Sequence, residues 1–555
     1  MLATRWVIEG TLTTETPLHI GDGATVPSSM FGFSREDAGG NRHEIEVAPV
    51  VMGLRAPAEP SGEPTRVPVI LASALKGVVR AWLENHVSGI ERKSFLESFG
   101  FQKEATPDHN AEGEGAKVEF LDAFMKPPAI ALQAEPYQSA DRTTQVAVNV
   151  AIDRRTRTAS DEKLVHAEYV PTDREFEVEI RGILTEEEVR FLLKGLAALS
   201  TGDVDRPTLG AGGASGWGLV QWHLTALRQF TQDHLEEALA NWRTNLGSFP
   251  NPYQAAVARG DFAAWAEAAT EAAQHAAAGD VNRLVLEFTL ALDGPFGVND
   301  HTRAGRASEG RNNLEPMRVA GNPGEYRLPA TSMRGVLRSQ CERILRTMCA
   351  NRLAAWPADQ PKLPGGPIFE DAKKLKIDLG LLDPVARLFG WAGWATTVRI
   401  DDFTGPEPPR PARPGGAAEP QSPQEMIAID RFTGGGAESA KFKVAFAWRP
   451  KLEGRITVDL GRLRLAENGE SSLALLAFAL RDLHEGDIAV GYGASKGYGT
   501  ASIEEFTVTG GTPEVRAVFK LLAVDVPPPA ATETLSAWCT TVVEHGNQFA
   551  AAHAG

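Results

Sequence analysis

Two segments of the chain alternate apolar and polar residues in the way that a half-buried β-strand requires. The first runs from Arg5 to His19 and the second from Leu284 to Leu292. Side chains on a strand point alternately to the two faces of a sheet, so each pattern predicts a strand with one buried face. A polar loop and then a helix-like apolar segment follow each strand. Both halves of the chain therefore open with the same series of elements.

The similarity continues along both halves in one order. The first predicted helix starts near Ser73, the expected N-cap, and the second starts near Ser332. Further pairs of similar segments follow: Ser98–Gly100 and Leu388–Gly390, Val118–Phe124 and Val398–Phe403, Ala151–Thr156 and Ala428–Thr433, Gly210–Gly218 and Gly491–Gly499. Recurrence in a fixed order predicts that one domain has been duplicated, with loops of different length.

The two glycine-rich segments, Gly210–Gly218 and Gly491–Gly499, are called the glycine tails below. Glycine at every second or third position tolerates positive φ and lets another chain approach closely. Such a backbone turns amide N–H groups outward, as binding of phosphate requires. A mobile surface loop is the alternative, and the second copy argues against it. The predicted contacts to a phosphate backbone are Gly213, Ser215, Ser495 and Lys496.

Strands and helices interleave in each half, which predicts an α+β fold with mostly antiparallel sheets. The chain has 555 residues, more than one ordinary domain holds. The predicted organisation is a first domain, a helical connector rich in Ala, Glu and Trp, a second domain with a Pro/Gly-rich insertion, and a C-terminal extension. Their bounds are 1–230, 231–282, 283–510 and 511–555.

The composition indicates the cellular environment and the kinds of partner to expect. The three cysteines form no CxxC pair, which favours a reducing, intracellular, cytoplasmic protein over a disulfide framework or a zinc site. No apolar run reaches the length of a membrane span. The net charge of −16 argues against a free nucleic-acid binder, so the positions of the basic residues decide the matter.

Basic residues gather at two kinds of place. The segment after Asp153 holds Arg154, Arg155 and Arg157 between hydroxyl side chains, and its copy after Asp430 holds Arg431. Arginine with flanking hydroxyls is suited to a phosphate backbone, although an Asp–Arg turn with a solvated basic edge is the alternative. Two further pairs lie four residues apart at helix starts, where each pair shares a face: Lys76 with Arg80 and Arg334 with Arg338.

The sequence contains no HExxH and no GxxxxGK[ST] motif, and GxSxG occurs only within the second glycine tail, at Gly493–Gly497. Single loop carboxylates beside the basic segments remain: Asp22, Asp37 and Glu46 in the first half, and Asp300 and Glu315 in the second. Of these, the catalytic candidates are Asp300, Asp37 and Asp22. A carboxylate near RNA can position Mg²⁺, the one cofactor that catalysis here would need, or it can cap its own loop. His19 is expected to be structural or to face the substrate rather than to bind a metal.

With these segments in order, the chain resembles the RAMP superfamily, and within it the backbone subunits of type III CRISPR effector complexes. The matching segments are Thr16–Gly21, Ala72–Gly77, Phe99-Gly100, Asn149–Arg154 with Thr156, and the glycine tails. Two copies in one chain resemble the fused subunits of the type III-D variants. The resemblance implies two RRM-like, ferredoxin-like palms, each with a protruding thumb hairpin, after Asp153 and after Asp430. It implies as partners a guide (CRISPR) RNA, a target RNA and other subunits of the complex.

The resemblance also bears on catalysis. Cleaving members of the family carry an Asp just before a short extended segment of the first loop. In this chain Val47 and Leu314 hold that place, so Asp300, Asp37 or Asp22 would have to act from elsewhere in the loop. Three functions follow: a guide-binding subunit that also cleaves target RNA, a non-catalytic backbone segment, or a processing nuclease of the same superfamily. The last requires a catalytic His, or a Tyr/His/Lys set, that the sequence does not clearly offer.

Overall fold

The computed structural model of the protein describes most of the chain. The described residues are 4–36, 42–57, 63–86, 98–102, 113–127, 137–139, 141–152, 159–201, 206–231, 234, 236, 256–278, 281–301, 303–304, 312–319, 322–349, 382–391, 394–406, 424–521 and 529–552. They form two compact units. The first consists mainly of residues up to Gly279 and the second mainly of residues from Asp280 onward.

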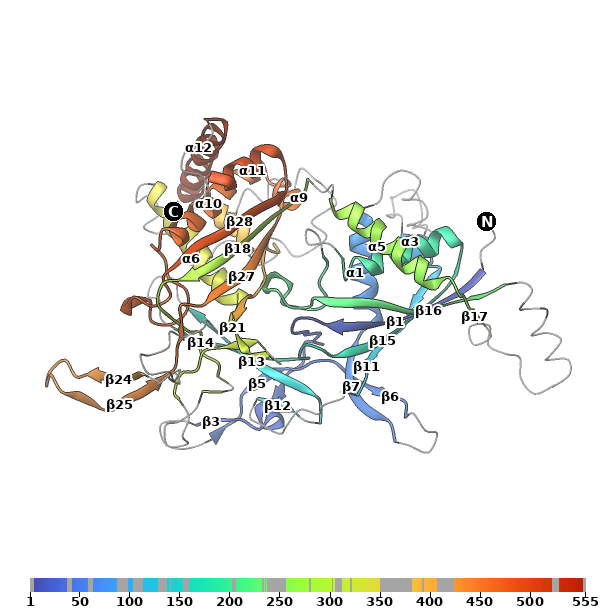
Figure 1. Cartoon of the computed structure of the whole chain (residues 1–555), viewed down its shortest axis with the longest axis horizontal. Helices are drawn as coiled ribbons and strands as arrows, with labels where there is room; N and C mark the ends of the chain where they lie inside the picture. The colour runs from blue at the N-terminus through green and yellow to red at the C-terminus, as the bar shows by residue number, and fades with distance from the viewer. Residues whose placement is uncertain are drawn as a thin grey trace, which may run out of the picture. The chain divides into compact units, whose positions relative to one another are not determined.

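The first unit is built on an antiparallel sheet with helices on one face (Figure 1). Its strands run in the order β17 (Val257–Ala258), β16 (Val220–Phe230), β1 (Thr4–Thr14), β15 (Glu175–Leu184), β11 (Ala123–Met125), β7 (Thr65–Ile70) and β6 (Met52–Arg55), and β10 (Val118–Phe120) also pairs with β15. The helices are α1 (Ala72–Asn85), α3 (Glu186–Ala197) and α5 (Phe262–Ala278). Buried apolar residues of the strands and helices form one core between these layers.

The second unit repeats this plan. Its strands run in the order β20 (Arg318–Val319), β21 (Asn322–Leu328), β23 (Phe403–Pro406), β27 (Lys451–Asp459), β18 (Arg283–Leu292) and β28 (Ala501–Gly510), and β22 (Val398–Ile400) also pairs with β27. Its helices are α6 (Ala330–Met348), α8 (Pro384–Phe389), α9 (Leu460–Leu463), α10 (Leu473–His484), α11 (Pro513–Lys520) and α12 (Pro529–Ala552). The larger ones pack on one side of the sheet (Figure 1).

Both sheets contain the strand order of a ferredoxin-like domain. In that fold the fourth strand lies beside the first, followed by the third and the second, with one helix after the first strand and another after the third. The order β16–β1–β15–β11 with α1 and α3 fits this plan, and so does β28–β18–β27–β23 with α6 and α10. Even the break in register falls at the same place, between Glu9 and Gly10 in β1 and between Glu287 and Thr289 in β18. The predicted α+β fold and the duplication are confirmed.

The helix starts correct one prediction. Helix α1 begins at Ala72, so Ser73 lies in its first turn and Leu71 holds the N-cap position. The N–H of Ala72 donates instead to Oδ1 of Asp122, at 2.7 Å. In the second unit the N–H of Ala330 donates to Oδ1 of Asp402, at 2.8 Å. A carboxylate from the second ferredoxin strand replaces the local cap, because a negative charge is favourable at a helix N-terminus.

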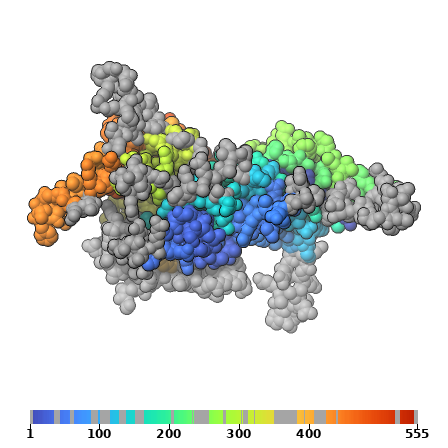
Figure 2. Space-filling view, turned by 90° about the horizontal axis from the view of Figure 1, so that it is seen from below, coloured from blue at the N-terminus to red at the C-terminus, as the bar shows by residue number. Residues whose placement is uncertain are grey.

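Each unit also carries a hairpin between its second and third ferredoxin strands. In the first unit, β13 (Thr144–Ile152) and β14 (Ala159–Tyr169) belong to a smaller sheet with β12 (Gln138–Ser139), β5 (Glu46–Ala48) and β2 (Val26–Pro27). In the second unit the hairpin is β24 (Gln424–Ile429) with β25 (Gly436–Val444), which stands out from its own unit in both views (Figures 1 and 2). These are the hairpins that the resemblance places after Asp153 and Asp430.

Short ladders and turns complete the described chain. The ladders are β3 (Arg35–Glu36) with β4 (Arg42–His43), β8 (Phe101–Gln102) with β9 (Gly113–Glu114), and β19 (Pro295–Phe296) with β26 (Ala447–Trp448). The 3-10 turns are η1 (Ser28–Phe31), η2 (Gly213–Ser215), η4 (Gly469–Ser472) and η5 (Ala494–Lys496). None of the described helices combines the length and the apolar composition that crossing a membrane requires.

Helix α12, in the C-terminal extension, is part of the second core and carries a buried histidine. Nε2 of His545 donates to the carbonyl of Leu382 at 2.9 Å. Burial, and then the nearby charge of Arg387, lowers the pKa of His545 from 6.5 to about 4. The unfolded chain therefore takes up this proton first as the pH falls, and folding loses stability between pH 6.5 and about 4.

This pKa shift predicts an acid-sensitive contribution to stability. The parent should lose about 3 kcal/mol more between pH 7 and pH 4 than His545→Gln, which keeps an amide donor but cannot be protonated. Denaturant unfolding at several pH values measures the difference. Parallel curves for the two proteins would show that His545 titrates normally in the folded state.

Candidate nucleic-acid interface

The glycine tails close each ferredoxin-like domain by pairing with the segment that follows its first strand. In the first unit the N–H of Gly218 donates to Pro17 O at 2.9 Å, and the N–H of Ala211 donates to His19 O at 2.8 Å. In the second unit Gly499 donates to Pro295 O at 3.0 Å, and Tyr492 donates to Gly297 O at 2.8 Å. Backbone hydrogen bonds thus hold the tails at the same place in both units.

Two glycines of the second tail allow the strain of a positive φ to be distinguished from steric overlap of an added side chain. Gly497 and Gly499 both have positive φ, +77° and +76°. A Cβ on Gly497 would meet no atom within 4 Å, whereas one on Gly499 would overlap the carbonyl of Val490. Of these two residues, Gly499 therefore requires glycine for both reasons.

We expect Gly497→Ala to cost about 1 kcal/mol of unfolding free energy, the left-handed strain alone. Gly499→Ala should cost about 2 to 3 kcal/mol, because the backbone of Val490 has to move as well. Denaturant titration of both variants measures the difference. Equal losses would mean that the tail relaxes without strain.

In the second unit the glycine tail lies against the base of the hairpin. Nζ of Lys496 lies 3.1 Å from Sδ of Met426 in β24 and 5.7 Å from the ring centroid of Phe442 in β25. The hydroxyl of Tyr498 lies 3.1 Å from Oε1 of Gln424. Lys496 and Ser495 are exposed, so two of the predicted contacts lie on one surface with the hairpin. The fold therefore brings together two features that are about 70 residues apart in sequence.

The hairpin tip is shaped by Asp430. Its Oδ1 accepts the N–H groups of Phe432 and Thr433, at 2.9 and 2.7 Å, and the hydroxyl of Thr433. Hydrogen bonds from Thr433 and Phe432 lower the pKa of Asp430, so the carboxylate stays charged. This turn leaves Arg431 exposed and Phe432 99% exposed. Asp430 itself is a structural residue of the tip.

The basic pairs at the helix starts share a face, as their spacing predicted, but they differ in environment. Burial and the charge of Arg80 lower the pKa of Lys76. Arg334 donates to the carbonyl of Val398 at 3.0 Å and to that of Phe389, and burial followed by the charge of Arg338 lowers its pKa to about 10. Nε of Arg338 lies 3.4 Å from Oε1 of Glu342. Of these residues, Arg334 is thus bound within its own unit, and an RNA contact for each of the four stays a prediction.

Four predicted residues lie outside the described residues, namely Asp37, Arg154, Arg155 and Arg157. Asp22 is exposed, and its Oδ1 accepts the N–H of Ala24 at 2.9 Å, which is the loop-capping role that was the alternative to catalysis. Gly213 and Ser215 form the turn η2 of the first glycine tail.

The two segments in which the family's acid would lie occupy equivalent places in the two units. Val47 pairs in parallel with β14, and Leu314 pairs in parallel with Val444 of β25.

Asp300 pairs through its backbone with a second acidic residue, Glu315. Its N–H donates to Glu315 O at 2.8 Å, and Asn312 donates to Oε1 of Glu315 at 2.6 Å. Mg²⁺ in nucleic-acid sites often takes one or two carboxylates and completes its shell with phosphate oxygens and water. Asp300 and Glu315 place two acidic residues on segments that the backbone pairs, although one oxygen of Glu315 already accepts from Asn312. The charge of a bound Mg²⁺ would stabilise a developing negative charge on phosphate.

A different acidic group, Asp482, Glu485 and Asp487, also places three carboxylates close together within the described residues. Asp482 accepts from Gln340 and from Arg481, so its oxygens are used within the fold. It therefore adds no candidate centre.

Sequence reasoning missed a buried polar network at the base of the first hairpin. Glu168 of β14 is fully buried, and its carboxylate accepts from Arg142 at 2.7 Å, from the N–H of Val50 at 2.7 Å and from the hydroxyl of Thr144. Its carbonyl oxygen lies 2.6 Å from Nδ1 of His19. The network ties the first loop, the segment 47–50 and the hairpin together.

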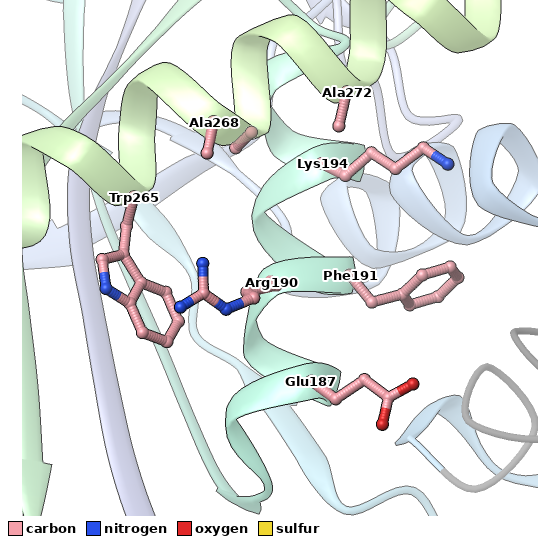
Figure 3. Close-up of a pocket in the computed structure, with 8 residues that line it drawn as sticks. Glu187, Arg190, Phe191, Lys194, Trp265, Ala268 and Ala272 are labelled. Atoms are coloured by element: carbon pink, nitrogen blue, oxygen red, sulfur yellow. The ribbon is translucent and has the colours of Figure 1, made fainter.

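A pocket of about 270 Å³ lies between α3 and α5 of the first unit (Figure 3). The guanidinium of Arg190 lies 3.9 Å from the ring centroid of Trp265 across the two helices, while Phe191 and Glu187 point away from that pair. None of the predicted site residues lines the pocket. In each unit, the candidate interface is therefore the surface formed by its own glycine tail, first loop and hairpin.

The fold and this interface define a protein of two tandem ferredoxin-like domains, each with a hairpin and a glycine tail beside its first strand. The chain belongs to the RAMP superfamily, whose family model matches residues 11–221 and 301–502. The two matched regions correspond to the two units, and membership indicates a CRISPR-associated RNA-binding module. No curated protein matches the chain.

Proposed function

We propose that the protein is a guide-RNA-binding backbone subunit of a type III CRISPR effector complex, with two RNA-binding palms in one chain. The observation that carries the proposal is the repeated association of a fixed glycine tail with the start of a first loop, in a family that binds RNA. In the second unit Lys496 supplies an exposed positive charge on the glycine tail, and Arg431 supplies another at the hairpin tip. A guide RNA running over both palms would meet the same surface twice.

Salt dependence tests this proposal. Each phosphate contact of a single strand contributes about 0.7 to the slope of log K against log salt concentration. Arg154→Ala/Arg155→Ala/Arg157→Ala should therefore lower the slope by about 2, measured with the full chain and a labelled single-stranded RNA.

A matched control removes the same charge elsewhere. Arg343, Arg346 and Lys520 are exposed residues of α6 and α11. Their triple alanine variant should keep the parent's slope. If both triple variants change the slope equally, the arginines act only through net charge, and the contact proposal fails.

A second candidate function is cleavage of the target RNA by the second unit. The pairing of Asp300 with Glu315 favours it, because two carboxylates on adjoining segments can share a Mg²⁺ ion with a phosphate. A non-catalytic backbone segment is the competing function. Mapping the fragments of a target RNA separates the two.

A further inference from the structure

The imidazole of His19 has no counterpart in the second unit. The carbonyl of His19 accepts from the first glycine tail as the carbonyl of Gly297 accepts from the second, so the two residues hold the same backbone position. Beside Gly297 lie Ala445 and Phe446, in place of the buried Glu168 network. In the second unit, glycine therefore occupies the backbone position that His19 holds in the first. The backbone therefore does not require an imidazole here, and its presence in the first unit calls for another reason.

The structure fixes which nitrogen of His19 is available. Nδ1 lies 2.6 Å from the carbonyl oxygen of Glu168. A carbonyl can only accept, so Nδ1 carries the hydrogen, and the neutral ring presents Nε2 as an acceptor. Glu168 is itself held by Arg142 and by the N–H of Val50. A buried ion pair is costly to form, and this one holds the ring in a single orientation.

The surroundings of Nε2 are shaped by glycine. A Cβ on residue 21 would lie 2.8 Å from Nε2 and 3.4 Å from the carbonyl oxygen of Pro49. Gly21 avoids this overlap and leaves room next to the nitrogen. Residues 21–25 are exposed, and His19 itself is half-buried. The acceptor therefore lies next to the exposed start of the first loop.

We propose that Nε2 of His19 accepts a hydrogen bond from a ribose 2′-hydroxyl of the RNA strand on the first unit, and that this contact selects RNA over DNA there. The inference rests on the proposed RNA-binding function and adds the group that is recognised. A phosphodiester has no proton to donate at neutral pH, whereas the 2′-hydroxyl donates and is the group that distinguishes RNA from DNA. Amide groups of the adjacent glycine tail can bind the phosphate of the same strand.

Four substitutions separate this contact from a structural role. His19→Asn keeps an amide donor for the Glu168 carbonyl and removes the atom at Nε2. His19→Gly copies the second unit, and His19→Gln places an amide near the Nε2 position. Gly21→Ala keeps the histidine but crowds Nε2. Circular dichroism and denaturant titration establish that each full-length variant is folded.

Binding is measured with a labelled single-stranded RNA and with the same sequence carrying 2′-fluoro groups, which keep the RNA sugar pucker but cannot donate. In the parent, His19 contributes about a threefold to tenfold preference for the hydroxyl form. His19→Asn, His19→Gly and Gly21→Ala should lower the preference by that factor, and His19→Gln should restore part of it. Placing the fluoro groups first in the guide strand and then in its paired target identifies which strand lies on the first unit.

The outcomes are distinct. An unchanged preference in His19→Asn overturns the inference while leaving RNA binding intact. A salt slope lower by about 0.7 in that variant would show that a protonated ring binds phosphate, which also overturns it. A parent that binds neither oligonucleotide overturns the proposed RNA-binding function, and the inference with it.

Discussion

Arg142→Met should lower the free energy of unfolding by about 3 to 5 kcal/mol, because it leaves the carboxylate of Glu168 buried without its counter-charge. Glu168 is 0% exposed and Arg142 is largely buried, so water cannot replace the lost partner. The N–H of Val50 and the hydroxyl of Thr144 remain as donors, but neither carries a charge. Denaturant unfolding of the purified chain measures the loss.

Two controls make this result specific to the buried pair. Arg142→Met/Glu168→Gln removes both charges and should recover part of the loss. Lys441→Met breaks an exposed ion pair, with Glu425 at 2.7 Å, and should leave the free energy of unfolding essentially unchanged. If Arg142→Met is no more destabilising than Lys441→Met, the network contributes little to the stability of the first unit.

The parts of the fold that could be predicted from sequence are those with local signals. Alternation over Arg5–His19 and over Leu284–Leu292 marks the two first strands, because a half-buried strand has period two. The glycine tails were recognisable because positive φ and close backbone approach both require glycine, as at Gly499. Their recurrence in one order gave the duplication, and the matching strand orders of the two sheets confirm it.

What could not be predicted depends on contacts between distant residues. The carboxylate of Asp122 meets the start of α1 from 50 residues away, so the local Ser73 was the wrong candidate for the cap. Arg334 has the same spacing to its neighbour as Lys76, yet its guanidinium is taken up by carbonyl oxygens far along the chain. No periodicity or motif marks the Arg142–Glu168 pair. The same limit applies to Asp300 and Glu315, which were recognised as separate loop carboxylates and which the fold makes neighbours.

Asp300→Ala should abolish one cut in a target RNA paired to the guide, while guide binding is retained. The expectation follows from the position of Asp300. Its N–H donates to the carbonyl oxygen of Glu315. Glu315 follows Leu314, the residue that holds the place of the family's acid. An acid in this loop does not hold phosphates, so its loss should affect cleavage rather than affinity. Removing a ligand that stabilises charge in the transition state costs on the order of a hundredfold or more in rate.

Matched variants locate the cut. Glu315→Gln should reduce the same cut, whereas Asp22→Ala should leave every fragment unchanged, because Asp22 caps its own loop through Ala24. Target fragments are mapped at single-nucleotide resolution with Mg²⁺ present and after its removal with a chelator. If Asp300→Ala and the parent give the same fragments, the carboxylate is structural. If the parent complex makes no cut that depends on this subunit, the protein is a non-catalytic backbone segment, and its two palms serve only to hold RNA.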